Sequence, residues 1–310
     1  MAHAELESLL SRGSNVFRNE PMSRHTTLRV GGPADLYVEP AGEQDLARVM
    51  QHCSRLALPW FIVGRGSNLL VEDGGIRGVV ISLSNTAFAA IDVHRTSLRC
   101  GAGARLKQVA HEARRHGLAG LEFLEGIPGN LGGGLRMNAG AMGSSLFEVA
   151  HTVRYMDSTG AIHEKPGADM GAAYRDCAFL KHHLALGAML TGHVDSSEAI
   201  AHRMKQYSGK RWESQPAAPS AGCMFKNPAS IPAGKLVEEL GLKGLRAGDA
   251  MISDVHGNFI VNKGHASAHD VLSLMHQVRE RALEERGIDL EPEVQIVGDA
   301  APSTSPVQVS

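Results

Sequence analysis

The sequence predicts a mixed α+β fold arranged in three parts. Its 310 residues exceed the usual length of a single domain. Short apolar runs of strand length alternate with segments of helical periodicity along the chain. A polar stretch at 205–219 precedes the last part. We place the parts at residues 1–84, 85–207 and 208–298.

The first part combines one helix with several strands. Residues 45–56 carry apolar side chains at helical spacing, and Pro59 stops that helix. Short apolar runs bounded by glycine or proline turns predict the strands, and the last two are expected to pair across the Gly74-Gly75 turn. The predicted strands are residues 35–40, 60–63, 69–71 and 79–83.

The second part contains a helix and a hairpin. Residues 104–115 place their apolar side chains on one face, and Gly117 is a natural residue to follow that helix. The hairpin is expected around the Ser158-Thr159-Gly160 turn. The predicted strands are residues 97–100, 153–157, 161–163 and 183–194.

The third part is expected to have a long helix between two strands. Ser267 is a plausible N-cap for a helix that ends at Arg286 before Gly287, and the strands are residues 259–262 and 290–297. Its inward residues are Val271, Leu274, Met275 and Val278. The tail from Ala300 is rich in Ser, Pro and Ala, and we expect it to be disordered. The alternative is that residues 299–310 return to the first part.

The composition argues against a nucleic-acid partner, a membrane segment and a metal site. The chain is 43% hydrophobic and 21% charged, with a formal net charge of −2 and no basic tract, so nucleic acid is not an expected partner. No apolar run reaches the roughly 18 residues of a membrane helix, and the first residues show no signal-peptide pattern. We therefore expect a cytoplasmic protein without a membrane segment. The cysteines form no CxxC pair, so no metal site is expected.

A glycine loop at 64–68 follows the predicted strand at 60–63. Its sequence, Gly-Arg-Gly-Ser-Asn, suggests a Rossmann dinucleotide loop. However, position 69 is leucine in place of the third glycine, and a strand follows where that motif opens a helix. A tight turn is an equal alternative for this loop taken alone.

A second glycine-rich segment favours a ligand-binding loop over a simple tight turn. Residues 125–134 and 138–141 are rich in glycine and almost free of charge. Consecutive small residues let backbone N–H groups face an anion. Two such loops in different parts suggest one extended diphosphate ligand, and crowded turn packing is the alternative.

Several longer motifs follow one another in a fixed order. They are residues 25–32, 64–68, 120–123, 127–129, 137–141, 174–175, 221–228, 258–262 and 290–298. Together they resemble the UDP-N-acetylenolpyruvoylglucosamine reductase family of peptidoglycan precursor synthesis. A set of motifs in register is more specific than any one glycine loop.

The resemblance implies a two-part FAD-binding unit of the vanillyl-alcohol-oxidase type and a C-terminal α+β substrate-binding domain. Residues 1–84 and 85–207 then form the FAD-binding subdomains, and residues 208–298 form the substrate-binding domain. FAD is expected to bind noncovalently, and the protein is expected to be a monomer. The short path from Ser144 to Tyr174 implies the shorter form of the family.

The resemblance also carries binding residues onto this chain. The expected FAD contacts are Gly64, Arg65, Gly66, Ser67, Asn68, Leu69, Gly126, Ile127, Pro128, Gly129, Gly132, Gly133, Asn138, Ala139 and Gly140. The expected substrate contacts are Tyr174, Lys226, Asn227 and Lys235, with Asn258 as a further candidate. His256 is expected to be structural.

The implied reaction is the NADPH-dependent reduction of a UDP-N-acetylglucosamine enolpyruvyl ether to UDP-N-acetylmuramate. NADPH reduces FAD, flavin N5 delivers hydride to the β-carbon, and the α-carbon is protonated. A cation must meet the substrate carboxylate, and Arg175 occupies the matching motif. Guanidinium suits this role because it offers a planar fork of donors. Without the resemblance, Arg175 would be a surface ion-pair residue.

The proton donor is expected at Cys223. The family most often has serine in this motif, where this chain has Gly222-Cys223-Met224-Phe225-Lys226-Asn227-Pro228. A free thiol has a pKa of about 8.5 and is a far stronger acid than an alcohol. Ionisation beside Lys226 would remove the proton. A buried, inert cysteine is the alternative.

A carboxylate is expected at Glu293. The predicted strand at 290–297 has alternating faces, which puts Glu291, Glu293 and Gln295 on one side, opposite Val294 and Ile296. The family's catalytic glutamate falls on Glu293, where it could hydrogen-bond the enolate-like intermediate. Glu291 is the alternative.

Two other classes of function remain. One is an FAD-linked oxidase of the same fold acting on a sugar or alcohol; many of these tether FAD through histidine or cysteine, and residues 64–71 and 126–143 contain neither. The other is a nucleotide-binding module without catalytic activity, against which Arg175 and Glu293 argue.

Overall fold

The computed structural model describes residues 2–301, and these divide into two compact units. Unit 1 contains the residues up to Phe17, Leu36–Ser67 and Val79–Gln215. Unit 2 contains Arg18–Asp35, Asn68–Gly78 and the residues from Pro216 on. The part of the predicted tail beyond residue 301 lies outside the described residues. The domain limits inferred from the sequence stay predictions.

Unit 1 contains two larger sheets with associated helices. Its helices are α1 (Ala2–Leu9), α2 (Glu43–Arg55), α3 (Leu106–Arg115), α4 (Leu131–Arg136), α5 (Leu146–Val149) and α6 (Ser197–Ser214), with 3₁₀ helices η2 (Thr86–Phe88), η3 (Glu122–Gly126), η4 (Gly167–Met170) and η5 (Ala178–Lys181). Its strands are β3 (Trp60–Val63), β6 (Ile91–His94), β7 (Ser97–Gly101), β8 (Leu118–Ala119), β9 (Gly140–Ala141), β10 (Ser144–Ser145), β11 (Ala150–Met156), β12 (Ile162–Pro166), β13 (Ala172–Ala173), β14 (Asp176–Cys177), β15 (Leu184–Thr191) and β16 (His193–Val194). The residues of β1 (Asn15–Pro21), β2 (Pro33–Glu39) and β5 (Ile76–Ser82) are divided between the units.

The first sheet has the order β1-β2-β5-β3, with β3 and β5 parallel. Helix α2 packs its apolar face against this sheet. Leu46 and Val49 of the helix are fully buried in one core cluster with Val79 and Ile81 of β5. The predicted helix at 45–56 and strand at 60–63 are confirmed.

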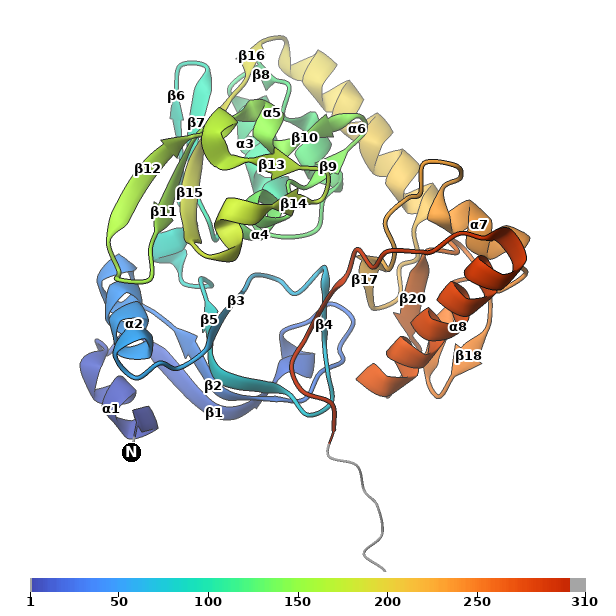
Figure 1. The fold of residues 1–310 in the computed structure, drawn as a ribbon. Helices are drawn as coiled ribbons and strands as arrows, with labels where there is room; N and C mark the ends of the chain where they lie inside the picture. Colours follow the sequence, from blue (N-terminus) through green and yellow to red (C-terminus); the bar gives the residue numbers. More distant parts are fainter. Residues whose placement is uncertain (1, 302–310) are drawn as a thin grey trace, which may run out of the picture. The chain divides into compact units, whose positions relative to one another are not determined.

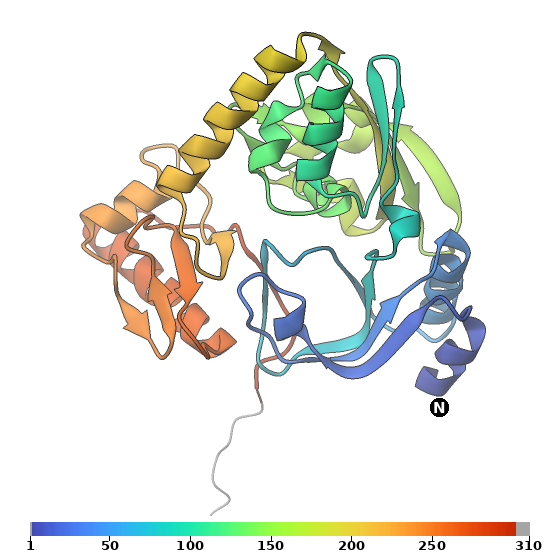
Figure 2. The same cartoon turned by 180° about the vertical axis from the view of Figure 1, so that it is seen from behind.

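The second sheet is antiparallel, in the order β12-β11-β15-β7-β6 (Figure 1). Leu106 and Val109 of α3 share a core with Leu98 of the sheet, and α3 lies beside α6 (Figure 2). The predicted hairpin is confirmed as β11 and β12, and Gly117 follows α3 with φ +64°. The strand predicted at 183–194 is divided, because β16 pairs with β8.

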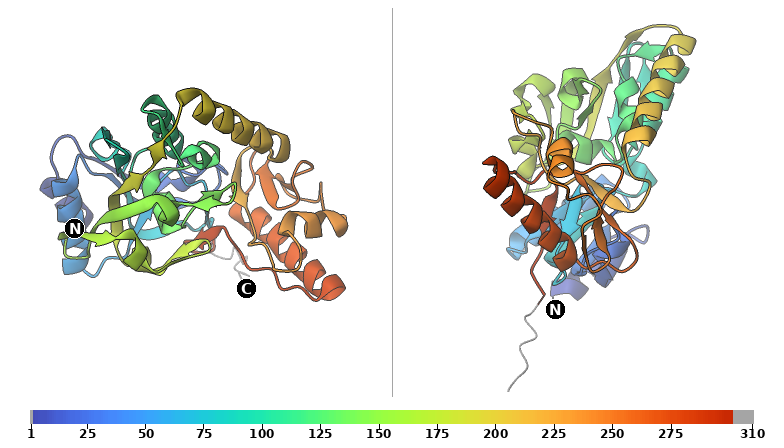
Figure 3. Two further views of the ribbon diagram at one scale, coloured as in Figure 1. Left: turned by 90° about the horizontal axis from the view of Figure 1, so that it is seen from above. Right: turned by 90° about the vertical axis from the view of Figure 1, so that its right-hand side faces the viewer.

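Unit 2 contains a four-stranded antiparallel sheet in the order β17-β20-β19-β18. Its strands are β4 (Leu69–Val71), β17 (Ser220–Cys223), β18 (Arg246–Ala247), β19 (Ala250–Ile252), β20 (Phe259–Asn262) and β21 (Gln295–Val297). Its helices are η1 (Met22–Arg24), α7 (Ala233–Glu239) and α8 (Ala268–Arg286). Helix α8 contacts β18 and β19 of this sheet (Figure 3).

The ends of α8 confirm the prediction from the sequence. Ser267 accepts the N–H of Asp270, and the Asp270 carboxylate accepts the N–H of Ser267, so the two form a capping box. Gly287 ends the helix with φ +64°, in the left-handed region. The predicted inward residues Val271, Leu274, Met275 and Val278 are buried.

The predicted pairing of residues 69–71 with 79–83 is wrong. Strand β4 pairs in parallel with β21, in the register Leu69 with Gln295 and Val71 with Val297. The N–H of Gly74 continues the contact by donating to the carbonyl of Asp299 at 2.8 Å. Proximity in sequence favoured β5 as the partner, but the hydrogen bonds of β4 are made with a distant segment.

The predicted strand at 290–297 is regular only from Gln295. Pro292 has no N–H to donate, and it forms a single bridge with Phe225. The N–H groups of both Glu293 and Val294 point at the carbonyl of Met224, at 2.8 and 3.4 Å. This bulge-like irregularity breaks the alternation of faces, so Val294 is 4% exposed but Ile296 is 39% exposed.

The described residues contain neither a membrane span nor a metal cluster. Within 2–301, no helix has both the length and the apolar character needed to cross a membrane. The same part of the chain contains no group of three or more His, Cys, Asp or Glu side chains that could hold a metal ion.

Candidate active site

The two predicted glycine loops meet in unit 1. The first follows β3, and the second joins η3 to α4. Ser67 Oγ donates to the carbonyl of Pro128 at 2.7 Å, across 61 positions of sequence. A Cβ atom at Gly129 would lie 3.3 Å from the same Ser67 Oγ. The fold therefore makes one surface from loops that are separate in the sequence.

The glycines of this surface are of two kinds. A Cβ atom at Gly64, Gly126 or Gly133 would meet no surrounding heavy atom within 4 Å. At Gly132 it would lie 3.0 Å from the Cβ of Ala102, and the Gly132 N–H already donates to the Ala102 carbonyl at 2.9 Å. Crowded packing therefore accounts for some of these glycines. The others leave open space along a bare backbone, which fits close approach of a dinucleotide such as FAD.

The remaining residues assigned to FAD have varied surroundings. Ile127 and Ala139 pack against the core of unit 1, and Arg65 is exposed. Leu69 is buried in β4 of unit 2. Gly66 is buried and has a φ of +61°. Ile127 is only partly buried, so its side chain packs against the core and also reaches the surface.

Arg175 is presented by a two-residue turn between β13 and β14. Its φ of +56° lies in the left-handed region, which is uncommon for a residue with a side chain. Its Nη1 donates to the carbonyl of Gly140 at 3.2 Å, and its guanidinium lies 5.2 Å from the ring centre of Tyr174. Tyr174 is 58% exposed. The turn thus displays a cation and an aromatic ring together.

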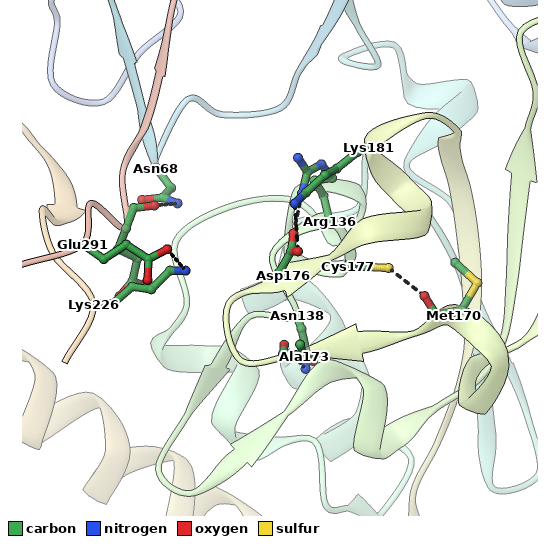
Figure 4. Close-up of polar contacts among 11 residues, drawn as sticks. Asn68, Arg136, Asn138, Met170, Ala173, Asp176, Cys177, Lys181, Lys226 and Glu291 are labelled. Carbon is green, nitrogen blue, oxygen red and sulfur yellow. Dashed lines mark hydrogen bonds and ion pairs between the residues drawn. The ribbon is translucent and has the colours of Figure 1, made fainter. Parts of the chain in front are cut away.

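The turn is held in place by polar contacts at its base (Figure 4). Asn138, with φ +39°, donates through Nδ2 to the Ala173 carbonyl at 3.1 Å. Asp176 pairs with Lys181 at 2.8 Å and with Arg136 at 3.3 Å. Burial raises the pKa of Asp176, but the Lys181 and Arg136 cations outweigh it, so its pKa lies below the ordinary value. Asn138 was assigned to FAD, and the fold also uses its side chain to hold this hairpin.

Cys223 lies at the end of β17 in unit 2. It is half-buried and sits opposite Phe259 of β20. The residue before it, Gly222, has a φ of +78°, and the register shifts between Ser220 and Cys223. The sharp turn of the backbone at Gly222 therefore directs the chain out of the sheet at the thiol.

The fold places Glu293 beside the segment that carries Cys223. The N–H of Glu293 donates to the carbonyl of Met224 at 2.8 Å. The next residues stay side by side, because the N–H of Lys226 donates to the carbonyl of Glu291 at 2.8 Å. The predicted proton donor and carboxylate therefore come from adjacent backbone segments, although 70 positions separate them in the sequence.

Asn68 holds the other side of Glu293. Its Nδ2 donates to the Glu293 carbonyl at 3.1 Å (Figure 4), and its own carbonyl accepts the N–H of Gln295 at 3.1 Å. The sequence assigned Asn68 only to the cofactor, as the last residue of a glycine loop. An asparagine in a loop carries no local signal for a partner 225 positions away.

Of the residues expected to bind substrate, Lys226, Asn227 and Lys235 lie in unit 2. Lys226 Nζ lies 2.5 Å from Glu291 Oε1 (Figure 4). Asn227 Oδ1 accepts the N–H of Ala233 at 3.0 Å, at the start of α7. Lys235 has a 66% exposed side chain. Lys235 is thus largely exposed, the ammonium group of Lys226 is paired with Glu291, and the oxygen of Asn227 stabilises a helix terminus.

Models of known protein families match two parts of this chain. A model of the FAD-binding domain matches residues 34–165, so this part of the chain is the FAD-binding domain of a flavoprotein. A model of the UDP-N-acetylenolpyruvoylglucosamine reductase C-terminal domain matches residues 215–297. The chain belongs to the UDP-N-acetylenolpyruvoylglucosamine reductase family.

Individual proteins of this family are similar in sequence to nearly the whole of this chain. A protein of this name from Heliobacterium modesticaldum is 44% identical over 286 residues, which is 91% of each chain. One from Magnetococcus marinus is 42% identical over 296 residues, covering 94% of this chain and 95% of its own. The crystal structure of the Thermus caldophilus enzyme has a TM-score of 0.81 at 37% identity, and the match covers 92% of this chain and 99% of that one. These findings confirm the predicted family and fold class.

Proposed function

We propose that this protein reduces UDP-N-acetylglucosamine enolpyruvate to UDP-N-acetylmuramate with electrons from NADPH, for peptidoglycan precursor synthesis in the cytoplasm. The placement of Glu293 beside the Cys223 segment carries the proposal, because this reaction needs an acid and a carboxylate at one carbon centre. The fold also meets the cofactor requirement, since open space lies beside Gly64, Gly126 and Gly133 in the FAD-binding domain.

FAD, when bound by these loops, would supply hydride chemistry for the enolpyruvyl group. The protein's own task is to hold the flavin and orient the substrate. Residues 64–71 and 126–143 contain no histidine or cysteine, which supports noncovalent binding in these loops. The sequence-based parts 1–84 and 85–207 remain our proposal for the FAD-binding subdomains, and 208–298 for the substrate-binding domain.

Arg175 is proposed to bind the carboxylate of the enolpyruvyl group. Negative charge spreads into that carboxylate as the β-carbon accepts hydride, and a fixed guanidinium stabilises it. The bond to the Gly140 carbonyl and the Asn138 contact to the hairpin limit the freedom of Arg175. Pre-organisation of this kind is a common reason for a strained backbone at a functional residue.

Cys223 is proposed to protonate the α-carbon. The S–H bond breaks, a C–H bond forms, and the resulting thiolate recovers its proton from solvent. Glu293 is proposed to orient the substrate or, when protonated, to hydrogen-bond the enolate-like intermediate. Tyr174, Lys226, Asn227 and Lys235 are proposed contacts for the rest of the UDP-sugar.

The test uses the purified full-length protein. A visible spectrum should show a noncovalently bound flavin that denaturation releases. NADPH oxidation should then depend on the UDP-enolpyruvyl sugar, with UDP-N-acetylmuramate as product. Flavin without substrate-dependent NADPH oxidation would contradict the reductase and favour an FAD-linked oxidase of a sugar or alcohol. A protein that binds no flavin would contradict both.

A further inference from the structure

Asn258 makes hydrogen bonds to nearby backbone and to one ring within the part of the chain described. It is 2% exposed and lies in the loop between β19 and β20. Its Oδ1 accepts the N–H of Phe225 at 2.9 Å, and its Nδ2 donates to the Phe225 carbonyl at 2.7 Å. Its backbone carbonyl accepts the N–H of Met224 at 2.9 Å.

These contacts begin where the regular sheet ends. Strand β17 pairs with β20 up to Cys223, and the residues that follow have left β17. The amide of Asn258 takes the place of a strand neighbour, because it offers Phe225 one acceptor and one donor as a peptide group would. Asn258 therefore determines the path of the chain directly after the thiol.

The same segment sets the position of Glu293. The Met224 carbonyl that accepts the Glu293 N–H belongs to the peptide group between Met224 and Phe225, and the N–H of that peptide group is the one Asn258 binds. Both polar groups of this one peptide unit are therefore bonded: its N–H donates to Asn258, and its carbonyl accepts the N–H of Glu293. A shift of this peptide group would move Cys223 and Glu293 together.

His256 supports Asn258 from the opposite side. The N–H of Asn258 donates to His256 Nδ1 at 3.1 Å. This requires an unprotonated Nδ1, because a protonated nitrogen would face another donor. The ring is confined, since a Cβ atom at Gly234 would lie 2.6 Å from His256 Cε1.

We propose that Asn258 is a positioning residue for Cys223, and that it sets the thiol against Glu293 through the Met224–Phe225 peptide group. The inference rests on the proposed function for the role of the thiol. Removal of the amide would leave the Phe225 N–H and carbonyl buried and unpaired, so the segment would move to find other partners. Displacement by about 1 Å can lower a reaction rate by roughly 10²-fold.

The test compares Asn258→Ala with Asn262→Ala in the FAD-loaded, full-length protein. Asn262 is a matched control because it is also a buried asparagine of unit 2, at 5% exposure. Its amide binds Leu28, Gly264 and Ala266, and none of these belongs to the Cys223 segment. Loss of stability alone should therefore affect both variants alike.

Two readouts separate positioning from stability. In Asn258→Ala, reoxidation of reduced flavin by the UDP-enolpyruvyl sugar should slow by about 10²-fold, while flavin reduction by NADPH is unchanged. The pH profile of Cys223 alkylation by iodoacetamide, followed by peptide mass spectrometry, should also shift. Cys53, Cys100 and Cys177 are buried and report on unfolding. In Asn262→Ala, both the reoxidation rate and the alkylation profile should match those of the parent.

Equal reoxidation rates and equal alkylation profiles in the two variants would overturn the proposal. If Asn258→Ala does not fold, His256→Leu serves as a milder variant, because it removes the acceptor of the Asn258 N–H and the ring contact with Phe259 but leaves the Asn258 amide in place. His256→Asn, which offers an oxygen near the place of Nδ1, should restore the parent profile, and failure of this rescue would also overturn it. A protein with no activity on the UDP-sugar but with the predicted alkylation shift would refute the proposed function and retain the positioning role.

Discussion

The single residue on which the proposed proton transfer depends most is Cys223. The structure places it half-buried, at the end of β17 and beside the Glu293 segment. A thiol is in general a stronger acid than an alcohol. It also brings sensitivity to oxidation, which an alcohol lacks.

Cys223→Ser should retain substantial turnover, whereas Cys223→Ala should reduce flavin reoxidation by about 10²–10⁴-fold, the usual contribution of general acid catalysis. Stopped-flow absorbance of the flavin measures this step directly. Flavin reduction by NADPH serves as the internal control, because it involves no protonation of the α-carbon. An alanine variant that forms product at the parent rate would exclude the thiol as donor.

Asn68→Ala tests whether the last residue of the first glycine loop serves Glu293. Loss of the 3.1 Å bond to the Glu293 carbonyl should slow flavin reoxidation by about tenfold and destabilise the protein by about 1 kcal/mol. Flavin content should stay near one per chain. Asn85→Ala is the control, since Asn85 caps η2. Loss of FAD with normal reoxidation by the remaining holoenzyme would show that Asn68 acts on the cofactor alone.

His256 gives the stability of the protein a pH dependence. Burial and the positive charge of Lys243 lower its pKa below the ordinary 6.5, although Glu238 opposes them. Below pH 6.5 the imidazole therefore binds a proton in the unfolded chain more readily than in the folded protein. The free energy of unfolding falls as pH falls, by at most about 1.4 kcal/mol per pH unit. Urea unfolding between pH 7.5 and 5.5 should show a smaller decrease in His256→Asn. An equal decrease in both proteins would refute this.

At the scale of elements, the helix termini show how local and distant signals combine. Ser267 and Asp270 form the capping box of α8 within one turn of sequence. The carboxylate of Asp73 accepts the N–H groups of Ala268 and His269, at 2.8 and 2.9 Å, from the loop after β4. A negative charge at this end also interacts favourably with the helix dipole.

Ser267→Ala should lower the free energy of unfolding by about 1 kcal/mol, since the N–H of Asp270 loses its acceptor. Chemical denaturation measures the change. Ser214→Ala is the control, because its hydroxyl bonds to carbonyls at the end of α6. A loss below a few tenths of a kcal/mol would mean that the Asp73 carboxylate suffices to cap the helix.

At the scale of the whole molecule, unit 2 is assembled from separate stretches of chain. Its core joins Leu28, Val30 and Leu70 to residues of the C-terminal region, and Asn262 binds the Leu28 carbonyl. A domain limit drawn from sequence alone at residue 208 leaves these contributions out. The C-terminal region depends on them for a complete core.

A fragment of residues 216–310 should therefore not fold cooperatively. Without Leu28, Val30 and Leu70, its apolar core stays partly exposed, and β21 lacks its partner β4. The measurement is urea unfolding followed by near-ultraviolet circular dichroism, with the full chain as control. A sigmoidal transition with native-like signal in the fragment would contradict this expectation.

Features whose hydrogen bonds join near neighbours could be predicted from the sequence. The limits of α2 and α8, the Ser267 cap, the Gly117 and Gly287 ends and the β11–β12 hairpin were all predictable. Local periodicity and turn chemistry suffice for such elements. The motifs around the glycine loops and Cys223 likewise indicated the family, because their residue types and order are properties of the linear chain.

Which distant segments share hydrogen bonds is evident from the three-dimensional fold and not from the sequence. Three contacts join residues far apart in sequence. They are the pairing of β4 with β21, the hydrogen bond from Asn68 to Glu293 and the hydrogen bond between Asn258 and Phe225. A strand edge or a side-chain amide accepts many partners equally well, so its own residues do not specify one. The packing of the remaining chain makes that choice, and this choice brings the backbone of Glu293 beside the segment that carries Cys223.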